Sequence, residues 1–215
     1  MDSKQPRKVT EQETFWAGEF GDEYVGRNQG PAAQAASLAL LAAILPHCAG
    51  TESTLELGTN LGLNQRSLAL LRPGLSQHGM EINAQAVDAL RKAMPEVTVH
   101  HGAIQEFVPT RKYDLVFTMG VLIHLAPESL PSVYRLMASC AARYVLMSEY
   151  YSPSPVEITY RGHSGRLFKR DFAGEFLDQN PGWQLRTYGC TYRRDPVFAH
   201  DDNTWFLMER RMPVA

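Results

Sequence analysis

One short segment, residues 54–64, constrains the fold of this chain more than any other. It reads TLELGTNLGLN, an apolar strand followed by a turn of small residues that runs into a helix. Gly58 and Gly62 allow a tight turn and let a ligand approach the backbone, and Asn60 between them tolerates a left-handed backbone. This order predicts the first strand, turn and helix of a Rossmann-like α/β sheet.

Strand and helix patterns alternate along the rest of the chain. Such alternation predicts a parallel sheet with right-handed crossovers and helices on both faces. Near the C-terminus two strand-like segments predict a closing antiparallel hairpin, which completes a mostly parallel seven-stranded sheet. The expected strands are 54–57, 77–82, 97–101, 113–119, 144–148, 184–192 and 203–210, and the expected helices are 30–45, 64–71, 84–94, 127–142 and 172–179.

Length and charge exclude several classes of protein. At 215 residues the chain is long enough for one α/β domain with a full core. Its net charge of -2 gives no basic surface for nucleic acid, and its longest apolar region, 32–46, is too short to span a bilayer. Its three cysteines lack the spacing of a metal site. Together with a polar N-terminus that has no signal core, these features predict a cytoplasmic protein without a metal, nucleic-acid or membrane partner.

The residues at the strand ends are candidates for a binding site, because ligands of open α/β sheets lie beyond the carboxyl ends of the strands. Glu81 ends the second expected strand, about twenty residues after the glycine turn, where an acid can hold both hydroxyls of a ribose. Small and apolar residues after the other strands can flank an adenine and the rest of a nucleoside. These residues are Ile82, Ala103, Ile104, Met119 and Gly120.

The spacing Glu56-x-Gly58-x-Asn60-x-Gly62 separates two kinds of nucleoside ligand. It resembles the first motif of class I S-adenosylmethionine (SAM) methyltransferases, whereas the Asn60 side chain would crowd the pyrophosphate of a dinucleotide. Glu56 can accept hydrogen bonds from the ammonium of a methionine moiety, directly or through water. We therefore expect SAM as the cofactor. A SAM-binding protein without catalysis and an NAD(P)-dependent reductase stay open as alternatives.

Nearly the whole chain resembles the pseudaminic acid biosynthesis-associated methylases, a family of SAM-dependent enzymes. The resemblance implies a class I methyltransferase fold and methyl transfer to an oxygen or nitrogen of a small polar metabolite related to sugars or nonulosonic acids. Its marks are FWxGxFGxxY with Arg27-Asn28, ELGxNxGLN at 56–64, VLIHL at 121–125, EYY at 149–151, VEIxYRGH at 156–163 and GRLFKRDF at 165–172.

Two segments outside the sheet are candidate parts of the site. Residues 1–30 form an expected lid segment with Arg27 on the cofactor carboxylate, before a methyltransferase domain at 31–215, although their aromatic residues can equally pack into the core. Residues 150–170 read as a loop excursion rich in cations, which predicts a small anionic acceptor molecule because guanidinium groups suit carboxylates and phosphates. A solvated basic loop is the alternative. The substrate-binding candidates are Tyr151, Arg161, His163, Arg166, Lys169 and Arg170.

Two residues are candidates for the base that removes a proton from the acceptor. His124 follows the fourth strand and titrates near neutrality, and Glu149 ends the fifth strand. Tyr150 is expected to orient the acceptor beside them. His124 can also serve only to brace its loop. The acceptor atom and the oligomeric state stay open.

Overall fold

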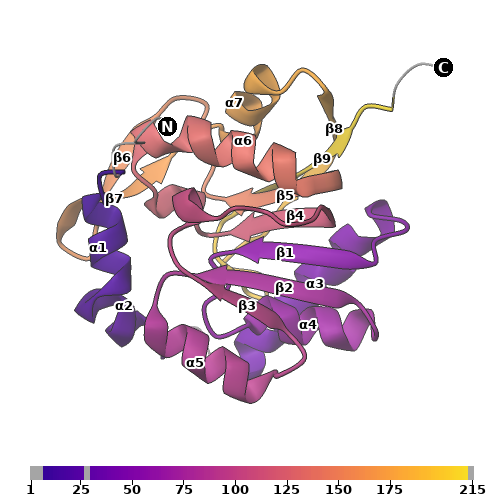
Figure 1. Cartoon of the computed structure of the whole chain (residues 1–215), viewed down its shortest axis with the longest axis horizontal. Helices are drawn as coiled ribbons and strands as arrows, with labels where there is room; N and C mark the ends of the chain where they lie inside the picture. The colour runs from indigo at the N-terminus through magenta and orange to yellow at the C-terminus, as the bar shows by residue number, and fades with distance from the viewer. Residues whose placement is uncertain (1–6, 27–29, 213–215) are drawn as a thin grey trace, which may run out of the picture.

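The computed structural model describes residues 7–26 and 30–212. Within them a seven-stranded sheet has the order β3-β2-β1-β4-β5-β9-β8 (Figure 1). The first five of these strands run parallel, and β9 runs antiparallel to both β5 and β8. The strands of this sheet are β1 (Ser53–Leu57), β2 (Ser76–Glu81), β3 (Thr98–His101), β4 (Tyr113–Met119), β5 (Ala141–Glu149), β8 (Trp183–Cys190) and β9 (Thr204–Arg210). The predicted sheet with its closing antiparallel hairpin is confirmed.

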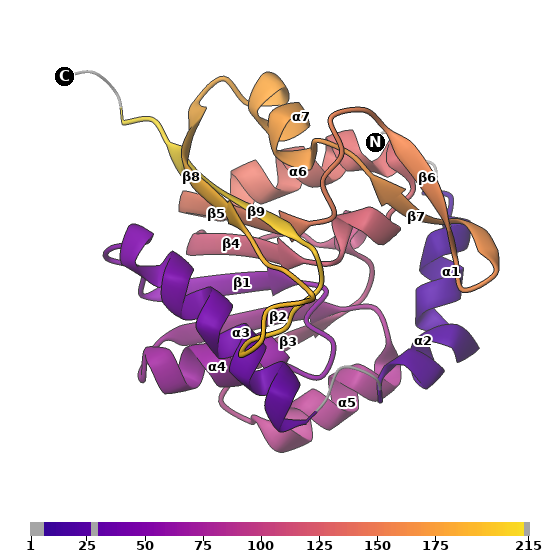
Figure 2. The same ribbon diagram turned by 180° about the vertical axis from the view of Figure 1, so that it is seen from behind.

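Helices cover both faces of the sheet, as predicted (Figures 1 and 2). Alternate residues of β4 explain the two layers, since successive side chains of a strand point to opposite faces. Leu115 and Phe117 pack on one face with residues of α3 and α4, and Val116 packs on the other with residues of α6 and α7. The helices are α3 (Pro31–Ile44), α4 (Leu63–Leu71), α5 (Ala84–Ala93), α6 (Leu130–Cys140) and α7 (Phe172–Gln179).

The predicted bounds of the helix over 127–142 and of the strand after it are wrong. The helix expected over 127–142 is shorter, with a 3-10 turn η4 (Pro127–Ser129) before α6, and β5 begins at Ala141 rather than at 144. Ala141 is a good helix former, but it pairs with Tyr113 of β4 and is buried. Sheet pairing therefore overrides the local propensity of alanine.

The loop expected over 150–170 is instead largely a second, two-stranded sheet made of β6 (Val156–Tyr160) and β7 (His163–Lys169). Tyr160 pairs with His163 across a two-residue turn in which Arg161 and Gly162 both have positive φ, 51° and 85°. Two positive φ values fit the right-handed twist of a hairpin, and glycine adopts one of them without strain.

Two short N-terminal helices, α1 (Glu11–Ala17) and α2 (Glu19–Tyr24), lie beside this hairpin in both views (Figures 1 and 2). Thr10 begins α1 with a capping box, in which its hydroxyl accepts from the Glu13 backbone N–H at 3.2 Å and the Glu13 carboxylate accepts from the Thr10 N–H at 2.7 Å. None of the described helices is long and apolar enough to cross a membrane.

Candidate functional site

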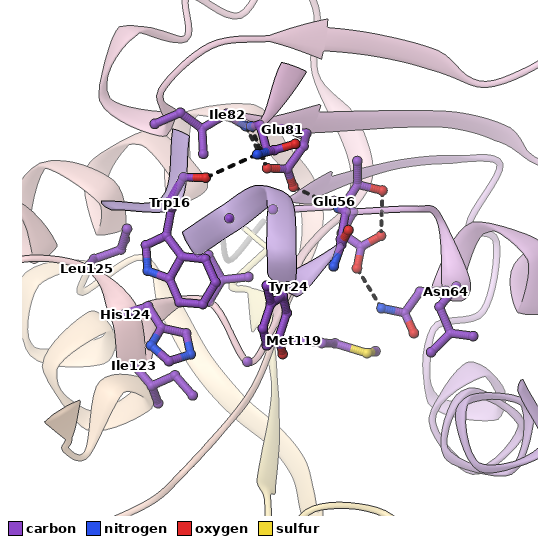
Figure 3. Close-up of a pocket in the computed structure, with 18 of the residues that line it drawn as sticks. Trp16, Tyr24, Glu56, Asn64, Glu81, Ile82, Met119, Ile123, His124 and Leu125 are labelled. Carbon is purple, nitrogen blue, oxygen red and sulfur yellow. Dashed lines mark hydrogen bonds between the residues drawn. The ribbon is translucent and has the colours of Figure 1, made fainter. Parts of the chain in front are cut away.

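A cavity of about 540 Å³ opens at the carboxyl edge of the parallel strands. Its wall is formed by α1 and α2, the turn after β1, the ends of β2 and β4, the segment after β3, the hairpin β6–β7 and the loop between β8 and β9. Figure 3 shows Trp16 and His124 at one end of this cavity, with Glu56 and Glu81 at the other. The cavity therefore lies where the topology of an open α/β sheet predicts a ligand.

The turn after β1 has a left-handed backbone at Gly58, Asn60 and Gly62, with φ of 78°, 47° and 75°. This confirms that the turn is formed with an asparagine at its centre. A Cβ at Gly58 would lie 2.6 Å from the Val121 side chain, and a Cβ at Gly62 would collide with Leu90 of α5. Gly58 and Asn60 line the cavity, whereas Gly62 faces α5 and allows close packing of that helix.

Glu81 is fixed by three backbone N–H groups. Ile82 and Asn83 donate to one carboxylate oxygen at 2.8 and 2.9 Å, and Asn60 donates to the other at 2.7 Å. Burial raises the pKa of Glu81. A carboxylate has about four acceptor positions, so Glu81 still has capacity for a ligand hydroxyl while it ties the turn after β1 to the end of β2.

Glu56 is buried beneath the same turn. Asn64 donates to its carboxylate at 2.6 Å and Thr59 at 3.1 Å, and burial raises the pKa of Glu56 to about 8. Near neutral pH the group therefore carries a proton for much of the time. A cation bound beside it would favour the ionised form, since an opposite charge stabilises a carboxylate.

Apolar and glycine residues complete this end of the cavity. Ile82 lies at the end of β2, and Ile104 begins the 3-10 turn η2 (Ile104–Glu106) after β3. Met119 and Gly120 line the wall after β4, whereas Ala103 is buried beside the cavity without lining it. A Cβ at Gly120 would meet nothing within 4 Å, so its backbone faces open space.

His124 lies at the other end, in the 3-10 turn η3 (Leu122–His124), between the rings of Trp16 and Tyr160. The ring centroids are 4.6 and 5.1 Å away. Its Nδ1 lies 2.7 Å from the backbone carbonyl of Arg166, which can only accept, so Nδ1 carries the proton and donates. Burial lowers the pKa of His124 to about 4, so the expectation that this histidine titrates near neutrality is wrong. The ring is therefore neutral near pH 7, with a lone pair on Nε2.

Glu149 lies behind the segment that carries His124 and is not part of the cavity wall. Its carboxylate accepts from the backbone N–H groups of Val121 and Ile123 at 3.2 and 3.4 Å. Burial raises the pKa of Glu149 to about 7. Tyr150 does line the cavity, whereas Tyr151 is exposed, with its ring centroid 5.8 Å from that of Phe206 and the two rings tilted by 48°.

The hairpin cations that the sequence singled out do not line the cavity. Each has another neighbour, and the hairpin contributes Tyr160 and Leu167 to the wall instead. Arg166 pairs with Glu11 at 3.3 Å, and Arg170 pairs with Glu175 at 2.7 Å. The Lys169 Nζ lies 5.1 Å from the ring of Tyr150, and the Arg161 guanidinium lies 5.6 Å from the ring of Tyr160. The His163 ring contacts those of Phe15 and Phe20.

The N-terminal helices both pack and line the cavity. Gln12 of α1 donates to the Gly165 carbonyl of the hairpin at 2.9 Å, and Trp16 and Tyr24 form part of the cavity wall. The two sequence interpretations of this segment, lid and packed aromatic helix, are therefore compatible. Arg27 lies outside the described residues.

Sequence analysis missed the loop between β8 and β9. Arg193, His200, Asp201 and Asn203 of this loop line the cavity. A signal for this loop was present in the sequence. The last expected strand is antiparallel, so it begins at the edge of the sheet where the parallel strand β5 ends. In the structure Thr204 pairs with Glu149, which brings the preceding residues to the carboxyl edge of the sheet.

Several buried polar atoms of the wall have no hydrogen-bond partner within the described chain. Such groups are rare in folded proteins unless a ligand or water completes them. They belong to residues from both ends of the cavity, which therefore offers donors and acceptors to a polar ligand. These atoms are Trp16 Nε1, Asn60 Oδ1, Gln105 Nε2, His200 Nδ1 and Asn203 Oδ1.

No family model matches the sequence, and no curated protein matches it. Solved structures are similar over most of their length. SAM-bound magnesium protoporphyrin IX methyltransferase (ChlM) from Synechocystis PCC 6803 aligns with a TM-score of 0.70 at 16% identity, covering 95% of this chain and 100% of that one. The glycopeptide N-methyltransferase MtfA aligns with 0.63 at 15% identity, covering 84% and 96%. CalS10, an amino pentose methyltransferase from Micromonospora echinaspora, aligns with 0.62 at 13% identity, covering 89% and 96%.

These alignments cover between 84% and 95% of this chain. The chain therefore has the Rossmann-like fold of the class I SAM-dependent methyltransferases.

Proposed function

We propose that this protein is a SAM-dependent methyltransferase that acts on a small polar metabolite. One observation carries the proposal. A carboxylate held by three backbone N–H groups, that of Glu81, lies beside the apolar Ile82 at the carboxyl edge of a methyltransferase fold. Structures with this fold hold SAM, as in ChlM, MtfA and CalS10.

The residues present suit SAM. Glu81 would accept hydrogen bonds from the ribose hydroxyls, and Ile82 and Ile104 would flank the adenine, with the unpartnered Gln105 Nε2 available to an acceptor atom of the base. Glu56 would lie near the methionine ammonium. Arg27 remains our candidate for the methionine carboxylate. When bound, SAM supplies a methyl group activated by a positively charged sulfur.

The chain's own residues then have two tasks. Its wall must exclude water and align the acceptor, because alignment supplies much of the acceleration of a displacement reaction. His124 can accept a proton from the acceptor at Nε2, since Nδ1 is committed to the Arg166 carbonyl. Glu149 holds the backbone after β4 and thereby positions His124.

The acceptor class is the finer part of the proposal. ChlM, MtfA and CalS10 are named for a porphyrin, a glycopeptide and an amino pentose. The glycopeptide and the amino pentose, together with the resemblance to methylases of nonulosonic acid pathways, support a sugar-related metabolite. An anionic group on that metabolite would lie at the rim beside Arg193, a cation that does line the cavity.

Calorimetric titration with SAM, S-adenosylhomocysteine and NADH tests the proposal. We expect both adenosyl compounds to bind and NADH to give no heat. A Glu81→Ala exchange should weaken SAM binding roughly ten-fold or more, because it removes a charge-assisted hydrogen bond worth about 1.5–3 kcal/mol. Glu52→Gln is the control, because Glu52 is exposed at the opposite edge of the sheet.

Binding of NADH alone would contradict SAM as the cofactor. Equal SAM affinity in wild type and Glu81→Ala would contradict the role of Glu81 in holding it. Turnover needs a second assay, in which labelled SAM is incubated with sugar nucleotides, amino sugars and sugar acids. SAM binding without methylation of any compound in that panel would favour the alternative of a SAM-binding protein without catalysis.

A further inference from the structure

The end of the cavity around His124 has a composition of its own. Aromatic rings form much of its wall, from Trp16 and Tyr24 of the N-terminal helices and from Tyr150 and Tyr160. The Trp16 ring lies 5.1 Å from that of Tyr24 and 4.6 Å from that of His124. Figure 3 shows the indole of Trp16 over the His124 ring, with Tyr24 beside them. Aromatic faces carry partial negative charge and attract cations.

The charges of this end also favour a cation. Asp201 lines the cavity, and burial together with the neighbouring Asp201 carboxylate raises the pKa of the Tyr150 hydroxyl. Among the described residues no Lys or Arg forms an ion pair with Asp201. The cavity-lining Arg193 is instead paired with Asp202 at 3.4 Å. Among the described residues of this end, the charge without an ion-pair partner is therefore the negative charge of Asp201.

A second observation is independent of charge. Asn203 is 5% exposed, lines the cavity, and its Oδ1 has no partner within the described chain. It directly precedes Thr204, which pairs with Glu149, so Asn203 lies across from Tyr150 at the rim of the sheet. Its Oδ1, the Asp201 carboxylate and the His124 Nε2 are all hydrogen-bond acceptors. They fit a ligand group that carries several N–H donors.

We propose, on the basis of the methyltransferase function above, that this subsite binds the acceptor through a protonated amine, held by Asp201 and Asn203 among the aromatic rings. One N–H proton passes to Nε2 of His124, and the N–H bond pair stays on nitrogen as a lone pair. With SAM bound, this lone pair would form the bond to the methyl carbon while the S–C bond breaks and its electron pair stays on the sulfur of S-adenosylhomocysteine. The amine would then leave as an N-methyl ammonium ion. An anionic group of the same molecule, at the rim beside Arg193, is compatible with this arrangement. The acceptor is thus an amino compound, and the product an N-methyl amine.

Binding to protein saturated with S-adenosylhomocysteine tests the subsite separately from turnover. The probes are 2-amino-2-deoxyhexoses and the parent hexoses, which differ by one ammonium and are compared by saturation-transfer NMR. We expect amino sugars to bind more tightly than their parents. Asp201→Asn should weaken amino-sugar binding roughly ten-fold or more, as for loss of a hydrogen bond to a charged group. Asn203→Asp, which adds a carboxylate, should strengthen it.

Asp195→Asn is the matched control, since Asp195 lies in the same loop and accepts from Val197 and Phe198 without lining the cavity. Thermal unfolding and S-adenosylhomocysteine affinity show whether each variant is folded. Equal binding of amino sugars and hexoses, or a preference that survives in Asp201→Asn, overturns the amine subsite and leaves the methyltransferase proposal standing. Failure of S-adenosylhomocysteine to bind wild type would instead overturn the proposed function itself.

Discussion

Individual carboxylates of this protein have different tasks because their surroundings differ. The Glu81 carboxylate faces the cavity and is fixed by three N–H groups. The Glu149 carboxylate accepts similar hydrogen bonds, but these hold the backbone segment that follows β4. Sequence analysis could identify both as strand-end acids. It could not separate them, because the direction of a side chain depends on the loop that folds over it.

His124 is the residue whose exchange should affect chemistry most. His124→Ala should lower the rate of methyl transfer roughly 10²–10⁴-fold, the usual contribution of a general base, and leave SAM affinity nearly unchanged. His47→Ala, an exposed histidine far from the cavity, is the control. Single-turnover rates with labelled SAM and calorimetry measure the two effects. A rate within a few-fold of wild type would exclude His124 as the base.

Glu149→Gln should act through structure rather than through proton transfer. Glutamine has a single carbonyl oxygen, so its NH₂ group would face one of the two backbone N–H donors. That buried N–H group would then lack an acceptor. We expect a loss of about 1–3 kcal/mol in the free energy of unfolding and a smaller loss of rate than for His124→Ala. Urea unfolding and the same kinetic assay measure both. The opposite order of the two rate losses would identify Glu149 as the base.

At the scale of elements, the N-terminal helices and the hairpin β6–β7 form the cover of the cavity. Arg7 links α1 to the turn η2 through Glu13 at 2.8 Å and Glu106 at 3.0 Å, and Arg166 of the hairpin pairs with Glu11 of α1. The aromatic pattern of 15–24 predicted that this segment is important. Its docking on the hairpin was not predictable, because the contacts join residues about 150 positions apart in the sequence.

Gly21 gives a direct test of this cover. A Cβ at Gly21 would collide with the Trp16 carbonyl, so Gly21→Ala should displace α2 from the cavity. If α2 encloses the cofactor through a few contacts, SAM binding should weaken roughly ten-fold or more. The far-UV circular dichroism of the sheet should stay unchanged. Gly26→Ala is the matched control, since a Cβ there meets nothing within 4 Å. Equal affinities in the two variants would show that the N-terminal helices are not a lid.

The sheet was the most predictable element. A short apolar run such as 113–119 favours a buried parallel strand, and β4 has the predicted bounds. The cations of 161–170 were the least predictable part of the site. Their identity is plain in the sequence, but the twist of the hairpin turns them toward Glu11, Glu175 and the tyrosine rings instead of the cavity.

At the scale of the whole molecule, the buried acids of the site make stability depend on pH. The pKa of Glu56 rises from 4.5 in the unfolded chain to about 8, and that of Glu149 to about 7. The folded protein therefore holds protons that the unfolded chain releases, and the free energy of unfolding falls as pH rises. His124 acts in the opposite sense, but only between about 4 and 6.5.

We therefore expect stability to fall between pH 6.5 and 8. Glu56→Gln should reduce this slope, because glutamine resembles the protonated acid at every pH. Glu209→Gln is the control, since its ion pairs with Arg143 and Arg186 lower its pKa and its contribution is constant in this range. Urea unfolding at several pH values measures the slopes. A slope unchanged by Glu56→Gln would show that Glu56 is ionised in the folded protein.

A crystal structure with S-adenosylhomocysteine tests the central claim most directly. We predict the ribose hydroxyls on the Glu81 carboxylate, the adenine between Ile82 and Ile104, and the sulfur facing the end of the cavity that holds His124. A ligand bound elsewhere on the protein, or a cavity that stays closed to it at saturating concentration, would contradict the proposed methyl transfer.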